Sequence, residues 1–235
     1  MLNPRASVSV VEAAPDIRVW VVDDALSEPE RWVERASQHR EAFASSDKDA
    51  YPGVQLALPD AVSQRLDELF GRTCRSELGA RRTLGVFSRL ALVTRQPEQL
   101  EPRQWICHRD RFSLPPEQCA AASVLYLFRD PRLGGTNFFR PRRPAMEVAR
   151  LVHDSGQLSP ADFSARYGIT AGYMRDSSDW FEHALNVPPR WNRLIFYDGG
   201  LFHCSDIPAP ELLDADPARG RLTLNGFFTC RRRAG

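Results

Sequence analysis

The chain has almost no lysine: one residue, Lys48, stands among 31 basic residues, and the rest are arginine. A phosphate-binding loop ending in Gly-Lys-Ser/Thr is therefore absent, and a pyridoxal Schiff base would have to use Lys48 in a polar loop. The basic residues are balanced by 30 acidic ones, so no excess of charge favours nucleic acid or an anionic membrane. We expect neither of these partners, and a small-molecule or peptide substrate instead. The use of arginine is also typical of a GC-rich bacterial genome.

Cysteine spacing and long apolar runs are lacking as well. The cysteines are odd in number and show no Cys-x-x-Cys spacing, which favours free thiols in a reducing compartment over disulfides or structural zinc. No run approaches 18 apolar residues, and the first residues do not resemble a signal peptide. We expect a soluble, cytoplasmic protein, and its oligomeric state stays open. The five cysteines are Cys74, Cys107, Cys119, Cys204 and Cys230.

The hydrophobic patterning predicts a mainly β protein with flanking helices. Helices are expected at 27–39, capped by Ser27, at 59–70, ended by Gly71, and at 145–152, 160–167 and 177–181. Strands are expected at 17–22, 82–94, 121–128, 136–139, 191–197, 201–205 and 221–229, with a hairpin-like turn at Gly134-Gly135. Residues 1–16 are expected to form a loosely held lead-in. Short strands that follow helices favour a sandwich or barrel over alternating βαβ units.

No linker-like stretch divides the chain, so we expect a single domain over residues 1–235. Within it, residues 1–95 form an N-terminal support region of helices and strands. Residues 96–230 form the catalytic core, which a helical insertion at 145–189 interrupts. The insertion is expected either to close over the site as a lid or to cover one sheet face.

A His-x-Asp pair, His108 and Asp110, ends an apolar run. In a strand, side chains two residues apart point to the same face, so one imidazole and one carboxylate can reach a single ion. His203 is the third candidate ligand because it lies on an apolar strand after a glycine turn, whereas His39, His153 and His183 lie in helical segments. Two histidines and a carboxylate are typical of non-haem iron oxygenases. Zinc hydrolases use similar sets, so the ligands alone leave both classes open.

Together with Arg221 at the head of the last apolar strand, these residues resemble the His-x-Asp…His…Arg signature of the Fe(II)/2-oxoglutarate-dependent dioxygenases, in particular their prolyl-hydroxylase-like branch. The resemblance covers residues 105–229. It implies a double-stranded β-helix, a jelly-roll or cupin-like core, with Fe(II) bound by His108, Asp110 and His203. It further implies that 2-oxoglutarate chelates the iron, that O2 is the second co-substrate, and that Arg221 holds the distal carboxylate of 2-oxoglutarate.

Two details of this resemblance need the structure. Tyr126 matches a tyrosine that can hydrogen-bond 2-oxoglutarate in relatives, although an ordinary strand aromatic is an equal interpretation. The interval of 18 residues from His203 to Arg221 is longer than usual for the branch, so Arg219 is a rival to Arg221. Strand alternation places both arginines on one face and does not separate them.

The resemblance implies an oxygenase that hydroxylates an unactivated C–H bond of a small molecule, amino acid or peptide side chain, with succinate and CO2 as co-products. Two alternatives remain. The first is a metal-dependent hydrolase or an iron enzyme that does not use 2-oxoglutarate. The second is a non-catalytic jelly-roll module that senses a ligand or metal. Alternation along the strands also predicts that Cys107, Cys204 and Arg109 point away from the metal.

Overall fold

The computed structural model describes residues 2–45, 50–110 and 114–233, so Lys48 lies outside the described residues. Two antiparallel sheets and four α-helices make up these residues, which confirms the expected mainly β class. The larger sheet has seven strands in the order β1-β2-β8-β5-β10-β4-β3, and the smaller has three in the order β7-β6-β9. The strands are β1 (Ser7–Ala14), β2 (Ile17–Asp23), β3 (Gly53–Ala57), β4 (Ala80–Val93), β5 (Gln118–Tyr126), β6 (Thr136–Pro141), β7 (Phe181–Val187), β8 (Leu194–Asp198), β9 (Phe202–Ser205) and β10 (Arg221–Arg232).

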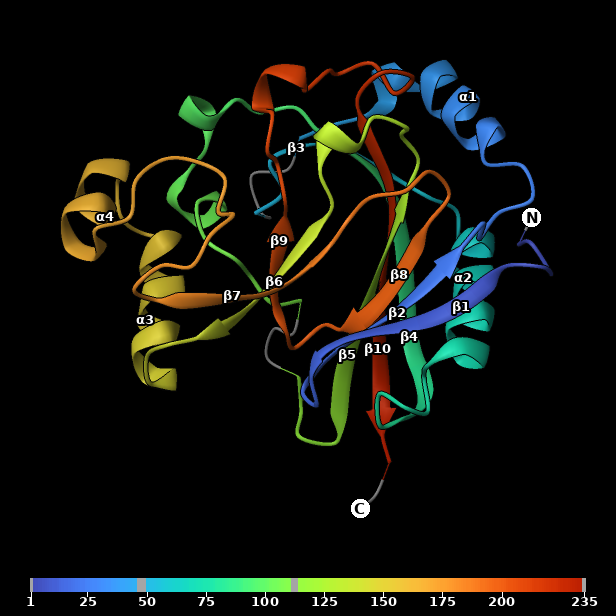
Figure 1. The fold of residues 1–235 in the computed structure, drawn as a ribbon, viewed down its shortest axis with the longest axis horizontal. Helices are drawn as coiled ribbons and strands as arrows, with labels where there is room; N and C mark the ends of the chain where they lie inside the picture. The colour runs from blue at the N-terminus through green and yellow to red at the C-terminus, as the bar shows by residue number, and fades with distance from the viewer. Residues whose placement is uncertain (1, 46–49, 111–113, 234–235) are drawn as a thin grey trace.

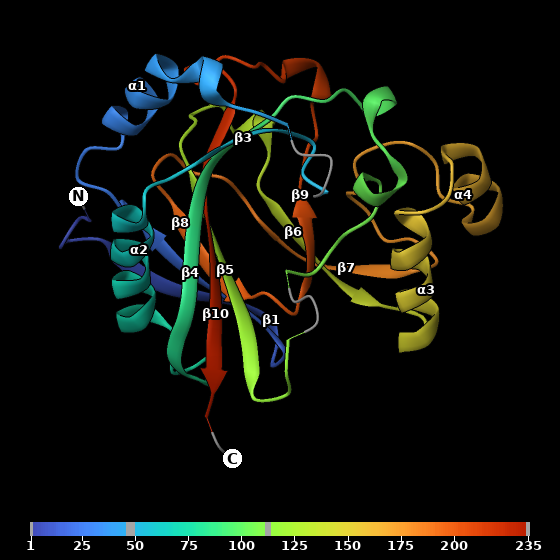
Figure 2. The same cartoon turned by 180° about the vertical axis from the view of Figure 1, so that it is seen from behind.

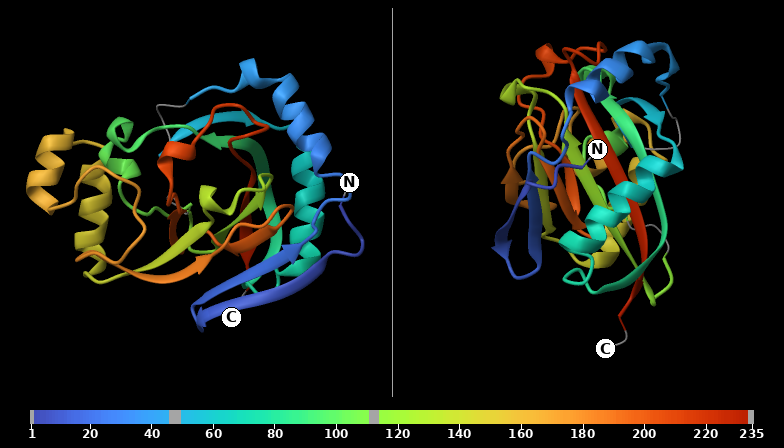
Figure 3. Two further views of the ribbon diagram at one scale, coloured as in Figure 1. Left: turned by 45° about the horizontal axis from the view of Figure 1, so that its top comes forward. Right: turned by 90° about the vertical axis from the view of Figure 1, so that its right-hand side faces the viewer.

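The two sheets face each other and form the expected double-stranded β-helix (Figures 1 and 3). Apolar side chains fill the space between them, from Ala122 and Ile195 of the large sheet to Phe138 and Val187 of the small one. The large sheet draws β1–β4 from the N-terminal half and β5, β8 and β10 from the C-terminal half, so strands distant in sequence lie side by side.

Helices α1 (Glu30–Gln38) and α2 (Asp60–Thr73) pack on the outer face of the large sheet. Leu66 and Phe70 of α2 enter the apolar layer, and Phe70 stacks on Phe228 of β10 with ring centroids 4.4 Å apart. Gly226 permits this close approach, because a Cβ there would lie only 2.3 Å from Leu66 Cδ2. The helix therefore supports the strand that carries Arg221.

Helices α3 (Ala145–Ser155) and α4 (Pro160–Tyr167) cover the outer face of the small sheet (Figure 2). Leu151 and Phe163, both fully buried, pack in one cluster with Phe139 and Phe181 of the small sheet. The two helices of the insertion thus cover this sheet face.

The expectation for the N-terminal segment was wrong. Residues 7–14 form β1, which pairs along its length with β2 as an edge strand. Ser27 does not cap α1, which begins at Glu30. Its hydroxyl instead donates to the Leu2 carbonyl oxygen at 3.3 Å, because the N-terminal segment folds back beside it. Gly71 does not end α2, which continues to Thr73.

Two expectations around the small sheet were also wrong. No helix forms at 177–181: the Ser178 hydroxyl accepts hydrogen bonds from the Trp180 and Phe181 amides, and this turn leads directly into β7. Gly134-Gly135 does not close a hairpin, because β5 and β6 belong to different sheets.

An ion pair ties the end of β2 to the segment just before β8 and gives a test of the fold. Both Asp23 oxygens accept hydrogen bonds from Arg193, at 2.7 and 3.0 Å, and Arg190 donates a third at 3.1 Å. The hydrogen bonds from Arg193 hold the pKa of Asp23 below its ordinary value, so the stabilisation is present above the unfolded-state pKa and is lost as the pH falls through the folded-state pKa.

We therefore expect Asp23→Asn to lower the free energy of unfolding by about 1–3 kcal/mol at pH 7, with the difference from the parent vanishing well below pH ~4. Urea unfolding across this pH range measures the effect. Asp130→Asn is the control, since that exposed carboxylate pairs locally with Arg132 and its loss should leave the midpoint unchanged. An equal difference at pH 7 and at pH 3 would contradict the assignment.

Candidate metal centre

Backbone pairing brings the three candidate ligands together. His203 lies on β9, and His108 lies on a segment that pairs with it: the His108 amide donates to the His203 carbonyl at 2.9 Å, and the His203 amide donates back at 2.8 Å. The Asp110 amide donates to the Gly199 carbonyl at 2.8 Å. The ligand segment thus extends the small sheet beyond β9.

One ligand atom from each of His108, Asp110 and His203 lies within 4.8 Å of the other two. Asp110 Oδ2 is 3.3 Å from His203 Nε2, and Asp110 Oδ1 is 3.8 Å from His108 Nε2. Ligands that bind one ion at right angles through bonds of 2.0–2.2 Å are about 3 Å apart. The set therefore needs only small side-chain movements to close on an ion.

Two further features fit a cation at this place. His203 Nδ1 lies 2.9 Å from the Leu201 carbonyl, which must accept a proton from it, so Nε2 is left to bind a metal. Asp110 Oδ2 is buried, and its contact with His203 Nε2 at 3.3 Å lacks the geometry of a hydrogen bond. A buried carboxylate oxygen without a hydrogen-bond donor is costly unless a cation satisfies it.

The electrostatics of the site couple the carboxylate to the histidines. Burial raises the pKa of Asp110, but the positive charges of His203, His108 and Arg89 outweigh burial and hold it below its ordinary value. Burial lowers the pKa of His203, and the charge of Asp110 outweighs this and raises it. Asp110 is therefore ionised and ready to bind a metal.

A small polar compartment lies behind the three ligands, between the sheets. Its volume is about 70 Å³, and its lining includes all three ligands and Arg221. Thr223 and Asn225 follow Arg221 along this wall, at every second position of β10. Thr136 of β6 and Tyr197 of β8, which both carry hydroxyl groups, also line the compartment. The compartment thus joins the candidate metal ligands to a guanidinium.

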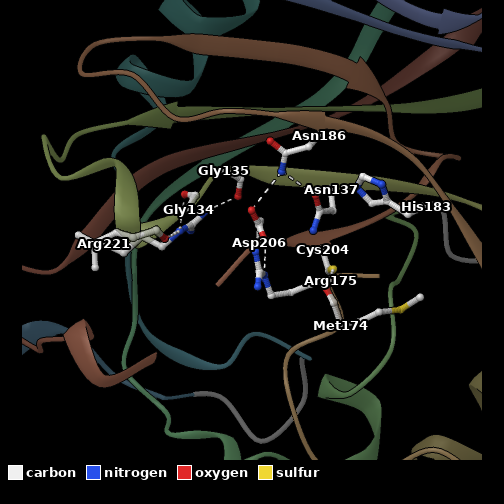
Figure 4. A network of polar contacts seen from close by, with 11 residues as sticks. Gly134, Gly135, Asn137, Met174, Arg175, His183, Asn186, Cys204, Asp206 and Arg221 are labelled. Carbon is white, nitrogen blue, oxygen red and sulfur yellow. Dashed lines mark hydrogen bonds and ion pairs between the residues drawn. The ribbon is translucent and has the colours of Figure 1, made fainter. Parts of the chain in front are cut away.

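Arg221 is 2% exposed, and backbone carbonyls hold its guanidinium. Its Nε donates to the carbonyls of Leu133 at 3.0 Å and Gly134 at 3.2 Å, and its Nη2 donates to Gly135 at 2.7 Å (Figure 4). Asp206 holds the turn at Gly134-Gly135, because its amide donates to the Gly135 carbonyl at 3.1 Å. A Cβ on Gly134, where φ is +74°, would lie 1.9 Å from the Asp206 carbonyl oxygen, so only glycine fits.

Arg219 is placed differently from Arg221. It is exposed, and it pairs with Asp214 at 2.7 Å and Asp216 at 2.8 Å in the loop before β10. Tyr126 is fully buried, and its hydroxyl lies 2.8 Å from Thr136 Oγ1. It therefore contacts a residue of the compartment wall without lining the compartment itself, and its role toward a co-substrate stays a prediction.

Sequence reasoning missed several wall residues. Thr223 and Asn225 share the face of Arg221 because they follow it at intervals of two, a signal that was available in the sequence. Tyr197, whose ring centroid lies 4.7 Å from that of His203, comes from β8 and could be placed only by the sheet order.

The neighbours of the ligands do not join the set. Cys107 is fully buried, and burial raises its pKa well above the ordinary thiol value. Cys204 donates its thiol proton to the Met174 carbonyl at 3.2 Å, and burial raises its pKa to about 12. Arg109 lies over the Phe202 ring at 4.6 Å. Both thiols are therefore protonated at neutral pH.

The loop at 168–180, between α4 and β7, crosses from the insertion to the ligand strand. It is fastened by the bond from Cys204 to the Met174 carbonyl and by the ion pair of Arg175 with Asp206 at 2.8 Å (Figure 4). The same Asp206 supports the turn that holds Arg221. The insertion is therefore connected both to the strand that carries His203 and to the turn that holds Arg221.

Several solved structures have a fold similar to that of this protein, and two of those described next contain bound alpha-ketoglutarate (2-oxoglutarate). The epimerase SnoN, solved with Fe³⁺, alpha-ketoglutarate and nogalamycin RO, is 13% identical, has a TM-score of 0.50 and aligns over 92% of this chain and 82% of its own. A prolyl-4-hydroxylase from Pseudomonas putida is 16% identical, with a TM-score of 0.45 and coverages of 98% and 95%. HygX from Streptomyces hygroscopicus, solved with nickel and 2-oxoglutarate, is 11% identical, with a TM-score of 0.48 and coverages of 91% and 82%. At these identities the similarity concerns the fold, and at that level it confirms the resemblance read from the sequence.

A family model matches residues 4–228, and the chain belongs to that family, DUF6445, a family of unknown function. A search of curated proteins gave no match. None of the helices in the described residues has the length and apolar character needed to cross a membrane.

Proposed function

We propose that this protein is an Fe(II)- and 2-oxoglutarate-dependent oxygenase that hydroxylates an unactivated C–H bond of an organic substrate. The co-products are succinate and CO2. His108, Asp110 and His203 hold the iron, and Arg221 binds the distal carboxylate of 2-oxoglutarate. Iron, 2-oxoglutarate and O2 supply the oxidising power when they are bound, and the protein positions them and excludes water.

The observation that carries the proposal is the buried charge of Arg221. The guanidinium is almost fully enclosed, its described hydrogen bonds go to neutral carbonyls, and no carboxylate pairs with it within the described residues. A buried charge without a counterion is costly, so a site built this way favours an anion beside it. The compartment that Arg221 shares with the metal ligands is where a dicarboxylate meets both groups.

Each wall residue has a defined part in this arrangement. The fork of Arg221 suits bidentate recognition of a carboxylate, and the carbonyls of Gly134 and Gly135 fix its orientation. Thr223 and Asn225 line the same compartment and offer polar groups beside the guanidinium. A cation at the triad and the guanidinium together bind two negative groups of one small molecule.

Succinate release tests the proposal. The protein, loaded with Fe(II) under anaerobic conditions, is given 2-oxoglutarate and then O2, and succinate is measured by chromatography. We expect succinate that depends on iron, 2-oxoglutarate and O2, at a slow uncoupled rate without substrate. The same protein with Zn²⁺ in place of iron is the control and should give none. No succinate, even with candidate substrates present, would favour a hydrolase or a binding module.

A further inference from the structure

A second, larger cavity of about 760 Å³ lies in front of the metal ligands. It shares His108 and Asp110 with the small compartment, but neither His203 nor Arg221 lines it. Pockets of 300–1,000 Å³ typically hold ligands of drug size. This cavity is therefore the place for the molecule that is oxidised, and its lining indicates what kind of molecule that is.

A row of flat side chains forms one wall. Phe87 and Phe227 are direct cross-strand partners on β4 and β10, with ring centroids 4.6 Å apart and planes 14° from parallel. The Arg89 guanidinium lies 4.8 Å over the Phe227 ring and 5.7 Å from the centre of the Tyr51 ring. We call these four residues the planar row. Its members stack on one another, so the row offers a ligand ring edges along its length and the free face of Phe87 at its outer end.

Phe87 at the outer end of the row is 55% exposed, although it lines a cavity. Exposed aromatic surface inside a hollow is typical of a ligand-binding site. The insertion provides a further wall through Tyr173 and Met174. The Tyr173 hydroxyl already donates to the Arg95 carbonyl at 2.6 Å, so its ring meets the cavity as apolar surface, and Met174 can adapt to the shape of a ligand.

The charges of the lining exclude one class of substrate. Asp110 is the sole carboxylate among the described residues around this cavity, and it belongs to the metal site. Arg89 adds positive charge, whereas Arg103 is paired with Glu101 at 2.7 Å. An ammonium group would find no anionic partner of its own in this lining and would meet the positive charge of Arg89. Free amino acids and polyamines are therefore disfavoured, and neutral or acidic molecules are favoured.

From these observations we infer that the substrate is a bulky, flat, ring-containing apolar molecule that is neutral or acidic. Its ring system stacks on the planar row, and its reacting carbon faces His108 and Asp110. The inference deepens the proposed function and rests on it for the chemistry, but the binding site itself can be tested without turnover.

The test uses N-phenyl-1-naphthylamine, a neutral molecule that carries a flat naphthalene ring system and fluoresces strongly in apolar sites. We expect saturable binding, and Phe87→Ala should weaken it by about five- to tenfold, since a stacked ring contributes roughly 1 kcal/mol. Phe87 is half exposed, so this variant should fold, which its thermal midpoint checks. Met146→Ala is the control, because Met146 on α3 is 82% exposed and does not line the cavity. Unchanged binding in Phe87→Ala, or no saturable binding by the parent, would overturn the inference.

A matched pair of competitors tests the charge. We expect 2-naphthoate to displace the probe at a concentration at least about tenfold lower than the ammonium form of 2-naphthylmethylamine, whose ring system is the same. Equal potency, or stronger displacement by the amine, would overturn the charge argument. Probe binding requires neither iron nor 2-oxoglutarate. If succinate forms but the probe does not bind, the substrate inference fails alone, and if the probe binds but no succinate forms, the proposed function fails.

Discussion

Replacing Arg221 by alanine is expected to raise the KM for 2-oxoglutarate by about a hundredfold or more, since removing one partner of a buried ion pair typically costs 3–5 kcal/mol. The guanidinium is enclosed and oriented by three carbonyl oxygens, so water replaces it poorly as a partner for a carboxylate. Steady-state succinate formation at varied 2-oxoglutarate measures the effect.

Loss of Arg221 also removes the donors to these carbonyls, so Arg221→Ala is expected to unfold at a lower temperature. Arg221→Lys separates the two effects. It keeps the positive charge and loses the fork, and we expect a KM between those of the parent and of the alanine variant. A parent-like KM in a folded Arg221→Ala variant would contradict the assignment.

Arg219→Ala is the matched control, two residues away on the same chain. Its guanidinium is exposed and already paired with Asp214 and Asp216, so its removal should leave the KM for 2-oxoglutarate unchanged. If this variant raises the KM and Arg221→Ala does not, the arginines have been assigned in the wrong order.

These two arginines show where sequence reasoning ends. The period of two along a strand gives Arg219 and Arg221 the same face, and neither composition nor spacing separates them. The structure separates them because β10 begins at Arg221, while Arg219 lies in the preceding turn. The acidic residues five and three positions before Arg219 were a local signal that this arginine has its own partners.

The parts of the fold that could be predicted are those with strong local patterns. The apolar strands that became β8, β9 and β10 were predicted close to their observed positions, and they carry His203 and Arg221. β1 was missed because it is an edge strand whose residues are mostly exposed, so only its pairing with β2 makes it a strand. β7 was missed: a short helix was expected at 177–181 because of a capping pattern there, and pairing with β6 decides the conformation of the residues that follow.

The candidate metal centre was predictable for a different reason. The His-x-Asp spacing is local, and the distant His203 follows a glycine turn between apolar strands. Both parts of the ligand set are therefore recognisable as sequence patterns. The planar row leaves none. Phe87 and Phe227 are 140 residues apart and meet only through the register of β4 and β10. Arg89 joins them on the neighbouring position of the same face.

Replacing Asp110 by alanine is expected to abolish metal binding. The rate of succinate formation should therefore fall by more than about a thousandfold, as it does on loss of an essential catalytic group. Asp110 is the only carboxylate of the candidate set, and the contact of its buried Oδ2 with His203 Nε2 lacks the geometry of a hydrogen bond. The two histidines that remain would bind a divalent ion weakly. Calorimetric titration with Mn²⁺ measures binding without turnover.

Thermal unfolding gives a second readout, because the effect of Mn²⁺ on Tm should differ between the parent and Asp110→Ala. A metal that binds only the folded parent at a hundred times its Kd stabilises it by about 2.7 kcal/mol, so Mn²⁺ should raise the Tm of the parent and leave that of Asp110→Ala unchanged. Without metal, the variant should be somewhat less stable than the parent at neutral pH, because it loses the favourable interaction of the Asp110 carboxylate with His203. Arg109→Ala is the control, since Arg109 stands between two ligands yet lies over Phe202, and it should keep the response to Mn²⁺. A Tm increase with Mn²⁺ that survives in Asp110→Ala would place the metal elsewhere in the chain.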